Sequence, residues 1–251
     1  MADLNWPAPP AAPASLPPWP EVDFRQFGEV GETVPLSRIQ KLTAGYLTRN
    51  WVSIPHVTHH DEADITELEL VRKREGEQAG RKLTLTPYLM KALASLLAKY
   101  PQFNASLDGT GQNLVFKKYF HVGMAIDTPN GLLVAVLRDC DRKSVVELAN
   151  EIDALATKAK TKGLPMKDMV GGCITISSLG HIGGTAFTPI VNAPEVAILG
   201  VTRAQWKPRR GANDAVEWRL MLPLSLSYDH RVINGADAAR FCAALAGLLA
   251  V

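Results

Sequence analysis

The chain has 251 residues, of which 47% are apolar and 21% are charged. This balance is typical of a globular protein with a sizeable core, in one large domain or two small ones. The net charge of +2 gives no global electrostatic attraction for nucleic acid or for an anionic membrane. No apolar run approaches the roughly 20 residues that a membrane span needs.

The first 20 residues carry seven of the 17 prolines, with alanine and serine between them. Such a segment favours extended backbone and cannot build a core. We therefore expect a linker or arm over residues 1–20 and one folded domain over residues 21–251. Residues 1–20 contain no Arg or Lys, which excludes a signal peptide or an Arg-rich transit sequence. The odd, widely spaced cysteines Cys140, Cys173 and Cys242 form no disulfide framework and fit a reducing compartment.

Apolar periodicity and turn residues predict helices that alternate with strands. The expected helices are 35–54 with Pro35 in the first turn, 67–78, 86–100, 144–162 with Ser144 as N-cap, and 236–249. The expected strands are 56–66, 113–117, 119–127, 132–137, two that flank a glycine-rich loop between 173 and 201, and 220–227, the last after a polar loop at 207–217. Strands that alternate with a few helices and are partly joined by hairpins predict an α/β sandwich with a mixed sheet. A doubly wound fold is not expected, because no phosphate-binding glycine loop follows the first strand.

The stretch SLSYDHRVINGADAARF at 225–241 places His230 between a strand and a helix. Both neighbours are stiff, so the imidazole can be aimed, and its pKa lies near neutrality. Either a catalytic base or a structural turn histidine fits this pattern.

A second polar cluster, HVTHHDE, lies at the start of the first expected strand. Strand alternation puts its possible ligands on opposite faces, so a metal site would need a further ligand from elsewhere. We therefore predict no metal site and favour a polar strand at a subunit contact; the residues concerned are His56, His59, His60, Asp61 and Glu62.

The glycine-rich segment GHIGG follows the serine pair Ser177–Ser178. It lacks the Walker pattern and the dinucleotide spacing, and no GxSxG elbow frames either serine. The hydroxyl of Ser177 at a strand end suits either an oxyanion donor or a structural role.

Four stretches of the chain resemble the dihydrolipoamide acyltransferases, the core components of 2-oxo acid dehydrogenase complexes. They are SLSYDHRVINGADAARF, TISSLGHIGGTAFTPIVNAPEVAILGV, PLSRIQKLTAGYLTRNWVSIPHVTHHDEADITEL and IDTPNGLLVAVLRD. The first resembles the H-x-x-x-D-G signature that this family shares with chloramphenicol acetyltransferases, with Asn234 in place of the Asp. The similarity covers about residues 21–250 and is greatest to acetyl-transferring members from bacterial pyruvate dehydrogenase complexes.

The resemblance implies a chloramphenicol-acetyltransferase-like two-layer α/β sandwich that forms trimers, with active sites at the subunit interfaces. In this family trimers commonly assemble into 24-subunit or 60-subunit cores, and a 24-mer is expected here. The implied substrates are coenzyme A and a lipoyl group on a separate domain, with no metal. The implied partners are the decarboxylase and dihydrolipoamide dehydrogenase components of a cytoplasmic bacterial complex that uses the pyruvate from glycolysis.

Site residues follow from the resemblance one position at a time. His230 matches the general base that takes the proton from a thiol, and Ser177 matches the oxyanion donor. Asn234 stands where most members have Asp, so it lacks the charge to balance an imidazolium, and an orienting or structural role is expected. Asp127 matches a position near the substrate channel. The family trimer implies that Ser177 reaches His230 from a neighbouring subunit.

Other functions fit the same residues. A catalytically silent scaffold core, acetyl transfer in an acetoin dehydrogenase complex, and acetyl transfer to a free small molecule remain alternatives. Acyl specificity depends on the shape of the pocket, which the sequence does not define.

Overall fold

The computed structural model describes residues 18–250. The chain divides into two compact units, Met1–Leu36 and Ser37–Val251. The first unit contains a short 3-10 turn, η1 (Phe24–Gln26), whose N-cap Asp23 accepts a hydrogen bond from the Arg25 backbone. Most of the expected linker at 1–20 lies outside the described residues. No helix between residues 18 and 250 is long and apolar enough to cross a membrane.

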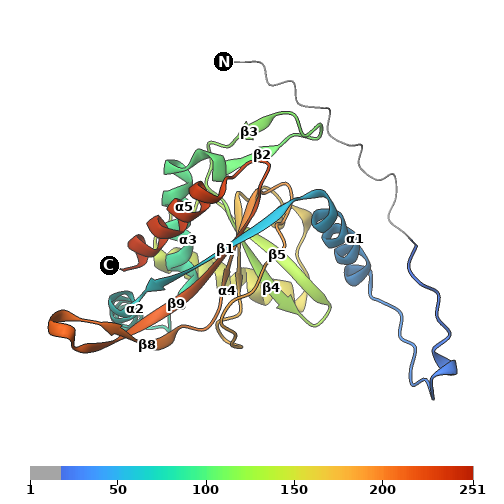
Figure 1. The fold of residues 1–251 in the computed structure, drawn as a ribbon, viewed down its shortest axis with the longest axis horizontal. Helices are drawn as coiled ribbons and strands as arrows, with labels where there is room; N and C mark the ends of the chain where they lie inside the picture. Colours follow the sequence, from blue (N-terminus) through green and yellow to red (C-terminus); the bar gives the residue numbers. More distant parts are fainter. Residues whose placement is uncertain (1–17, 251) are drawn as a thin grey trace. The chain divides into compact units, whose positions relative to one another are not determined.

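The second unit is built on a seven-stranded mixed sheet (Figure 1) with the order β1-β9-β7-β6-β4-β5, in which β8 pairs with the outer part of β9. The strands of this sheet are β1 (His56–Asp64), β4 (Val122–Thr128), β5 (Gly131–Leu137), β6 (Ile174–Ser178), β7 (Ala197–Val201), β8 (Gln205–Arg210) and β9 (Val216–Asp229). Strand β6 pairs in parallel with β4 and β7, and the other pairs are antiparallel. A separate hairpin joins β2 (Ala105–Leu107) to β3 (Leu114–Phe116).

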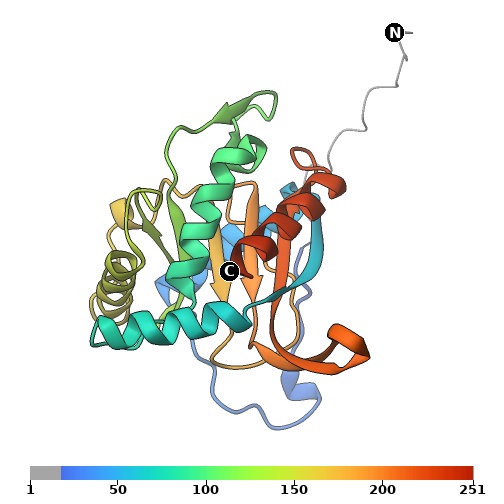
Figure 2. The same ribbon diagram turned by 90° about the vertical axis from the view of Figure 1, so that its left-hand side faces the viewer.

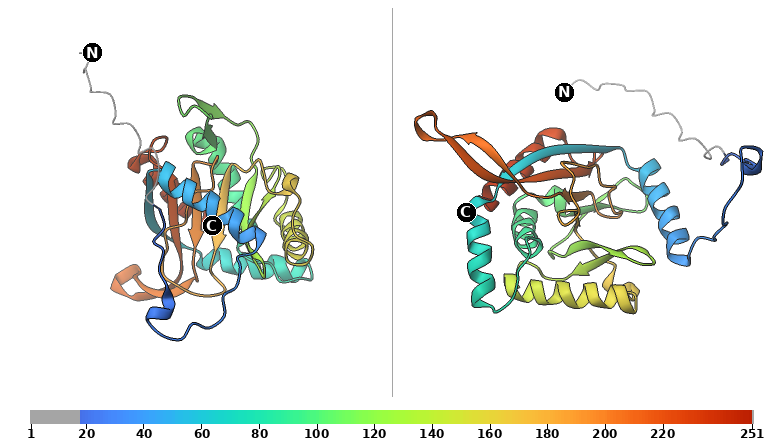
Figure 3. Two further views of the ribbon diagram at one scale, coloured as in Figure 1. Left: turned by 90° about the vertical axis from the view of Figure 1, so that its right-hand side faces the viewer. Right: turned by 90° about the horizontal axis from the view of Figure 1, so that it is seen from below.

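Helices cover the sheet unequally. The helices are α1 (Arg38–Ser53), α2 (Thr66–Gln78), α3 (Thr86–Lys99), α4 (Val145–Thr161) and α5 (Gly235–Leu249), with short 3-10 turns η2 (Pro101–Asn104), η3 (Met166–Asp168) and η4 (Ala212–Asp214). Figure 2 shows α3 and α5 in front of the sheet, and Figure 3 shows α1 on the opposite face. The predicted mixed-sheet α/β sandwich is confirmed.

Local sequence explains where the main helices begin. Ser144 is the N-cap of α4, as predicted, and the structure adds a capping box with Glu147. Helix α1 starts with the same device between Ser37 and Gln40, so Pro35 lies before the helix and not in its first turn. Each box satisfies amide groups that have no partner inside the helix.

Two parts of the predicted pattern are wrong. The stretch 207–217, predicted as a polar loop, is mostly the β8–β9 hairpin, with only residues 211–215 between the two strands. The many basic side chains gave no strand pattern. Both faces of the hairpin are largely exposed, so its strands need no alternation of apolar and polar residues. Strand β2 was also missed, since three residues are too short to show a period.

The two faces of the sheet differ in chemistry. One face packs against α3, α4 and α5 and holds the main core, in which Ile174, Ile176, Leu224 and Leu226 are buried. Strand alternation sends their neighbours to the other face. We call this second face the polar face; it carries Thr58, His60, Thr175, Ser177, Ser225 and Ser227.

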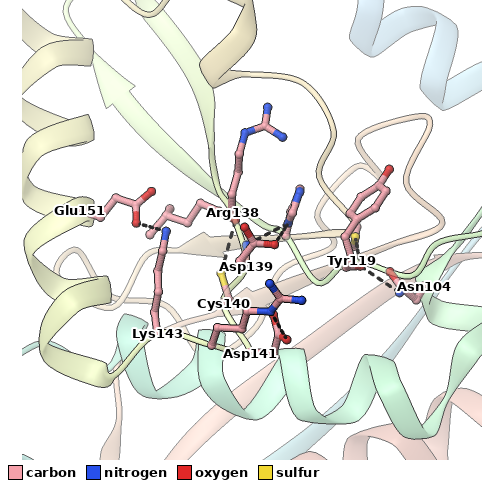
Figure 4. Close-up of polar contacts among 12 residues, drawn as sticks. Asn104, Tyr119, Arg138, Asp139, Cys140, Asp141, Lys143 and Glu151 are labelled. Atoms are coloured by element: carbon pink, nitrogen blue, oxygen red, sulfur yellow. Dashed lines mark hydrogen bonds and ion pairs between the residues drawn. The ribbon is translucent and has the colours of Figure 1, made fainter.

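The three cysteines are free thiols in buried positions, as expected from their spacing. Burial raises the pKa of Cys140 to about 11 and that of Cys242 to about 12, which keeps both thiols protonated. Figure 4 shows Cys140 in the turn after β5 beside Asp139, whose φ of 50° is unusual for a residue other than glycine. The Asp139 amide donates to His121 Nδ1 at 3.0 Å, which holds this turn.

Candidate active site

His230 lies in a turn that backbone and side-chain hydrogen bonds hold firmly. Its own amide donates to the Pro55 carbonyl at 3.1 Å, where β1 begins beside the end of β9. The Asp229 amide donates to Val196 O at 2.9 Å. The imidazole itself is exposed, with its ring centroid 5.9 Å from that of Tyr228. A fixed backbone under an exposed imidazole suits proton transfer to a substrate from outside the protomer.

Asp229 and Arg231 form an ion pair within this turn that sequence reasoning did not identify. Arg231 Nη2 donates to Asp229 Oδ2 at 2.6 Å, and its Nε donates to Oδ1 at 2.9 Å. Asp229 is buried, and its carboxylate also accepts the Arg231 amide at 3.0 Å. The carboxylate raises the pKa of Arg231 through these bonds. The pair keeps the buried charge of Asp229 compensated and the turn closed.

Asn234 occupies the N-cap of α5, four residues after His230. Its carbonyl accepts the amides of Asp237 and Ala238 at 3.0 Å. Its side chain makes no capping hydrogen bond and is exposed. The amide group is therefore free to contact a group outside this protomer.

Ser177 lies near the end of β6 on the polar face. The register places Ser177 level with Gly200 of β7 and then with Ser225 of β9. The Ser225 hydroxyl lies 3.0 Å from His60 Nδ1. The ring of Phe187 lies over Gly200, where an added Cβ would come within 2.7 Å of Phe187 Cζ. Because Gly200 pairs with Ser177, the Phe187 ring lies beside Ser177.

One protomer keeps Ser177 and His230 apart. His230 follows Ser225 by five residues along β9, and Ser225 is two strands from Ser177. These steps correspond to about 16 Å along the strands and about 10 Å across them. A base and an oxyanion donor that serve one acyl group need to be within hydrogen-bond reach of the same few atoms. The single chain therefore does not bring these two residues together.

Asp127 lies at the other end of the sheet from His230. Strands β4 and β6 are parallel, and Met124 pairs with Ile176. Asp127 is therefore level with residue 179, which follows Ser177 along the chain. Its side chain is exposed and lines a cavity of about 610 Å³ together with Ser178 and Arg203. Neither Ser177 nor His230 is among the described residues that line this cavity.

The histidine-rich start of β1 does not form a metal site within residues 18–250. His56, Thr58, His60 and Glu62 share the polar face with Ser225, as the bonds to β9 and β8 indicate. Strand alternation turns His59 and Asp61 to the other face.

The mixed sheet and its helices have a chloramphenicol-acetyltransferase-like α/β fold. A solved chloramphenicol acetyltransferase matches it with a TM-score of 0.57 at 15% identity, over 82% of this chain and 94% of that one. The family model "2-oxoacid dehydrogenases acyltransferase (catalytic domain)" matches residues 29–250. The chain belongs to this family of acyltransferase catalytic domains, which confirms the resemblance found in its motifs.

Curated relatives place the chain more closely. It is 57% identical over 240 residues to the dihydrolipoyllysine-residue acetyltransferase component of pyruvate dehydrogenase complex from Pseudomonas aeruginosa, covering 94% of this chain and 44% of that protein. The component of the same name from Azotobacter vinelandii is 57% identical over 232 residues, which are 91% of this chain and 36% of that protein. The chain thus spans less than half the length of these relatives.

Two solved structures match with a TM-score of 0.90 and 56% identity, over 94% of this chain and 97% of theirs. One is the cubic core of the pyruvate dehydrogenase multienzyme complex. The other is Azotobacter vinelandii dihydrolipoamide acetyltransferase, from a study of the role of a serine, a histidine and an asparagine in its catalytic mechanism.

The spacing of those three residues bears on the two serines of this chain. The histidine and asparagine there are as far apart in sequence as His230 and Asn234. The serine there is one residue closer to its histidine than Ser177 is to His230, which is the spacing of Ser178. Ser178 lies on the helix-covered side of β6 by alternation and lines the cavity, whereas Ser177 lies on the polar face.

Proposed function

We propose that the chain is the catalytic core domain of a dihydrolipoyllysine-residue acetyltransferase, which transfers an acetyl group from dihydrolipoamide on a lipoyl domain to coenzyme A. The proposal includes a trimer that assembles further into a 24-subunit core, as the cubic core of a related structure supports. Its partners would be the decarboxylase and dihydrolipoamide dehydrogenase components of a pyruvate dehydrogenase-type complex. A bacterial cytoplasm is the proposed location.

The separation of Ser177 from His230 within one chain carries this proposal. A threefold assembly that sets the polar face of one subunit against the His230 turn of the next would join them. Exposed His230 and the unused side chain of Asn234 both fit a site completed by a second subunit.

The chemistry follows from these side chains. His230 takes the proton from the thiol of coenzyme A, because the thiolate is the effective nucleophile. The thiolate attacks the thioester carbonyl, and the Ser177 hydroxyl donates a hydrogen bond to the tetrahedral oxyanion. The intermediate expels the dihydrolipoamide thiolate, which recovers the proton from His230. Asn234 is proposed to orient groups at this site, and Asp127 to lie near the substrate channel.

The test is intersubunit complementation. His230→Ala and Ser177→Ala are each expected to lower acetyl transfer between acetyl-coenzyme A and dihydrolipoamide by at least 10²-fold. In mixed trimers formed by co-expression, about a quarter of the interfaces combine an intact histidine with an intact serine, so about a quarter of the activity should return.

Three outcomes would change the proposal. Mixed trimers without recovered activity would place both groups in one protomer. Ser178→Ala is the matched control, and a loss for Ser178→Ala in place of Ser177→Ala would move the oxyanion donor to Ser178. Wild-type protein without any His230-dependent turnover would leave a silent scaffold core.

A further inference from the structure

His56 hydrogen-bonds through both of its ring nitrogens to backbone groups. The Val191 amide lies 2.9 Å from Nε2, and the Ile54 carbonyl lies 2.9 Å from Nδ1. An amide can only donate and a carbonyl can only accept, so Nε2 is the acceptor and Nδ1 carries the proton. These contacts define a neutral imidazole with one tautomer. Adding a second proton would break the bond from Val191.

The ring and its partner are held on further sides. The indole of Trp51 stacks on the His56 ring with centroids 5.6 Å apart and planes at 29°. Val191 is fully buried, and its carbonyl accepts from Asn50 Nδ2 at 3.0 Å. Both backbone polar groups of Val191 are therefore satisfied by side chains from the α1–β1 segment. The imidazole has no freedom to rotate without losing a bond to a buried amide.

One end of this arrangement supports His230. The amide of His230 donates to Pro55 O, and Pro55 stands between Ile54 and His56. Asp229 also lies directly opposite His56 in the β1–β9 register. The bond from His56 Nδ1 to Ile54 O closes the backbone around Pro55. A shift of this segment would move the carbonyl on which the His230 amide rests.

The other end supports the segment that follows Ser177. Val191 belongs to residues 179–196, which connect β6 to β7 and cross the polar face. In the same segment Phe187 packs over Gly200, and its amide donates to Ser225 Oγ at 3.5 Å. The bond from Val191 to His56 is a side-chain tie between this segment and the start of β1.

We propose that His56 is a positioning residue of the acyl-transfer site, which fixes the segment after Ser177 to the backbone that holds the His230 turn. This inference rests on the proposed function. In a trimer built as proposed, each subunit offers its His230 to one neighbour and its Ser177 to the other. We call the His230 part and the Ser177 part of one subunit its two half-sites. His56 thus fixes the position of one half-site relative to the other. No part of the substrate needs to touch it.

The test compares three replacements of His56. His56→Ala removes both bonds and is expected to lower kcat on the order of 10- to 100-fold, with KM for coenzyme A within about threefold. His56→Gln places an acceptor near the position of Nε2 and should recover most of the loss. His56→Asn places a donor near Nδ1 but does not reach Val191, so its kcat should stay close to that of His56→Ala. A purely structural role would not separate Gln from Asn in this way.

Amide hydrogen exchange gives a readout that does not depend on turnover. The Val191 and His230 amides should exchange faster in His56→Ala than in the wild-type chain, and the Val191 amide should be protected again in His56→Gln. His59→Ala is the matched control, because His59 lies on the other face of the same strand. It should leave both amides unchanged.

Several results would overturn the inference. These are a His56→Ala protein with kcat within about twofold of wild type, wild-type exchange at both amides, or equal kcat for the Gln and Asn variants. If His56→Ala does not fold, the comparison of Gln with Asn decides the question. If wild-type protein shows no acetyl transfer, the proposed function fails, and amide exchange still decides whether His56 fixes the two segments.

Discussion

Glu195 is a buried carboxyl group just before β7, and its hydrogen bonding is incomplete. Its Oε1 accepts from Asn192 Nδ2 at 3.2 Å, while Oε2 has no hydrogen-bond partner among residues 18–250. Burial raises the pKa of Glu195 to about 7. The neighbouring Thr175 hydroxyl, Lys117, whose own pKa burial lowers, and Asn192 only partly oppose this rise. The carboxyl group is therefore held mostly as the acid below neutrality.

This burial predicts a pH dependence of stability. The folded chain binds the Glu195 proton more tightly than the unfolded chain, so the contribution to stability is complete below pH 4.5 and is lost as the pH rises through about 7. Glu195→Gln cannot ionise and should gain stability relative to wild type by on the order of 3 kcal/mol between pH 5 and pH 8. Urea unfolding of both proteins at several pH values measures this. Parallel pH profiles would show that Glu195 is ionised and compensated in the folded chain.

At the residue scale, the sequence identifies residues in recognisable motifs but not the residues that hold them in position. His230 and Ser177 stand in recognisable strings, so a resemblance can find them. The bond between His56 and Val191 joins residues 135 positions apart through a backbone amide. No side-chain pattern at position 191 signals that bond. The Asp229–Arg231 pair likewise depends on the closed turn, in which the Arg231 amide and guanidinium both bond to the Asp229 carboxylate.

At Gly200, strand β7 has no side chain, and the Phe187 ring occupies the space that a side chain would need. An added Cβ would lie 2.7 Å from Phe187 Cζ and 2.9 Å from Cε1, well inside contact distance. Gly200→Ala should therefore push the Phe187 ring off the polar face beside Ser177. The expected effects are a loss of about 1–3 kcal/mol in the free energy of unfolding and a clear fall in acetyl transfer.

Two further variants make this prediction specific. In the double variant Gly200→Ala with Phe187→Leu, the smaller side chain leaves room for the new Cβ, so part of the stability should return. Gly247→Ala in α5 meets nothing within 4 Å and should be neutral or stabilising. Chemical denaturation reports on all three, and additive losses for Gly200 and Phe187 would contradict the contact.

Elements with a strong local signal were predicted well. Helices α3 and α4 combine an apolar stripe with a clear start, at Thr86–Pro87 and Ser144, and both were placed within about two residues. The β8–β9 hairpin was not, because its strands gain stability from backbone pairing and from ion pairs such as Arg209 with Glu62 at 2.7 Å. Those bonds need a partner strand that sequence periodicity does not reveal.

At the scale of the whole molecule, the sequence predicted the sandwich and its family. It did not predict how far apart Ser177 and His230 lie within one chain. Strand order decides that Ser177 and His230 lie at different ends of the sheet. Strand order depends on long-range pairing, such as β9 between β1 and β7, and periodicity carries no such information. The family trimer supplied the expectation that two subunits meet, and the register within one chain is consistent with it.

Helix α1 points to the surface through which subunits would meet. Leu42 and Tyr46 are 51% and 53% exposed, although a surface helix usually buries such residues. Trp51 and Val52 add to the exposed apolar surface near its end. Figure 3 shows α1 on the face of the sheet away from α3 and α5, and by strand alternation the polar face lies on that side. An exposed apolar surface beside a half-site fits contact with a second copy of the chain.

This arrangement predicts that Leu42→Glu separates the subunits, because a carboxylate in a dry interface loses its hydration without a partner. Sedimentation should show smaller particles than wild type, and acetyl transfer per chain should fall with dilution and recover at high protein concentration. Leu70→Glu in α2, where Leu70 is also exposed but lies on another helix, is the matched control and should keep the wild-type particle. His230→Ala should also stay fully assembled, since alanine keeps the backbone amide that bonds to Pro55 and holds the turn. A Leu42→Glu protein that keeps both its size and its activity would remove α1 from the interface and leave the polar face to meet its neighbour elsewhere.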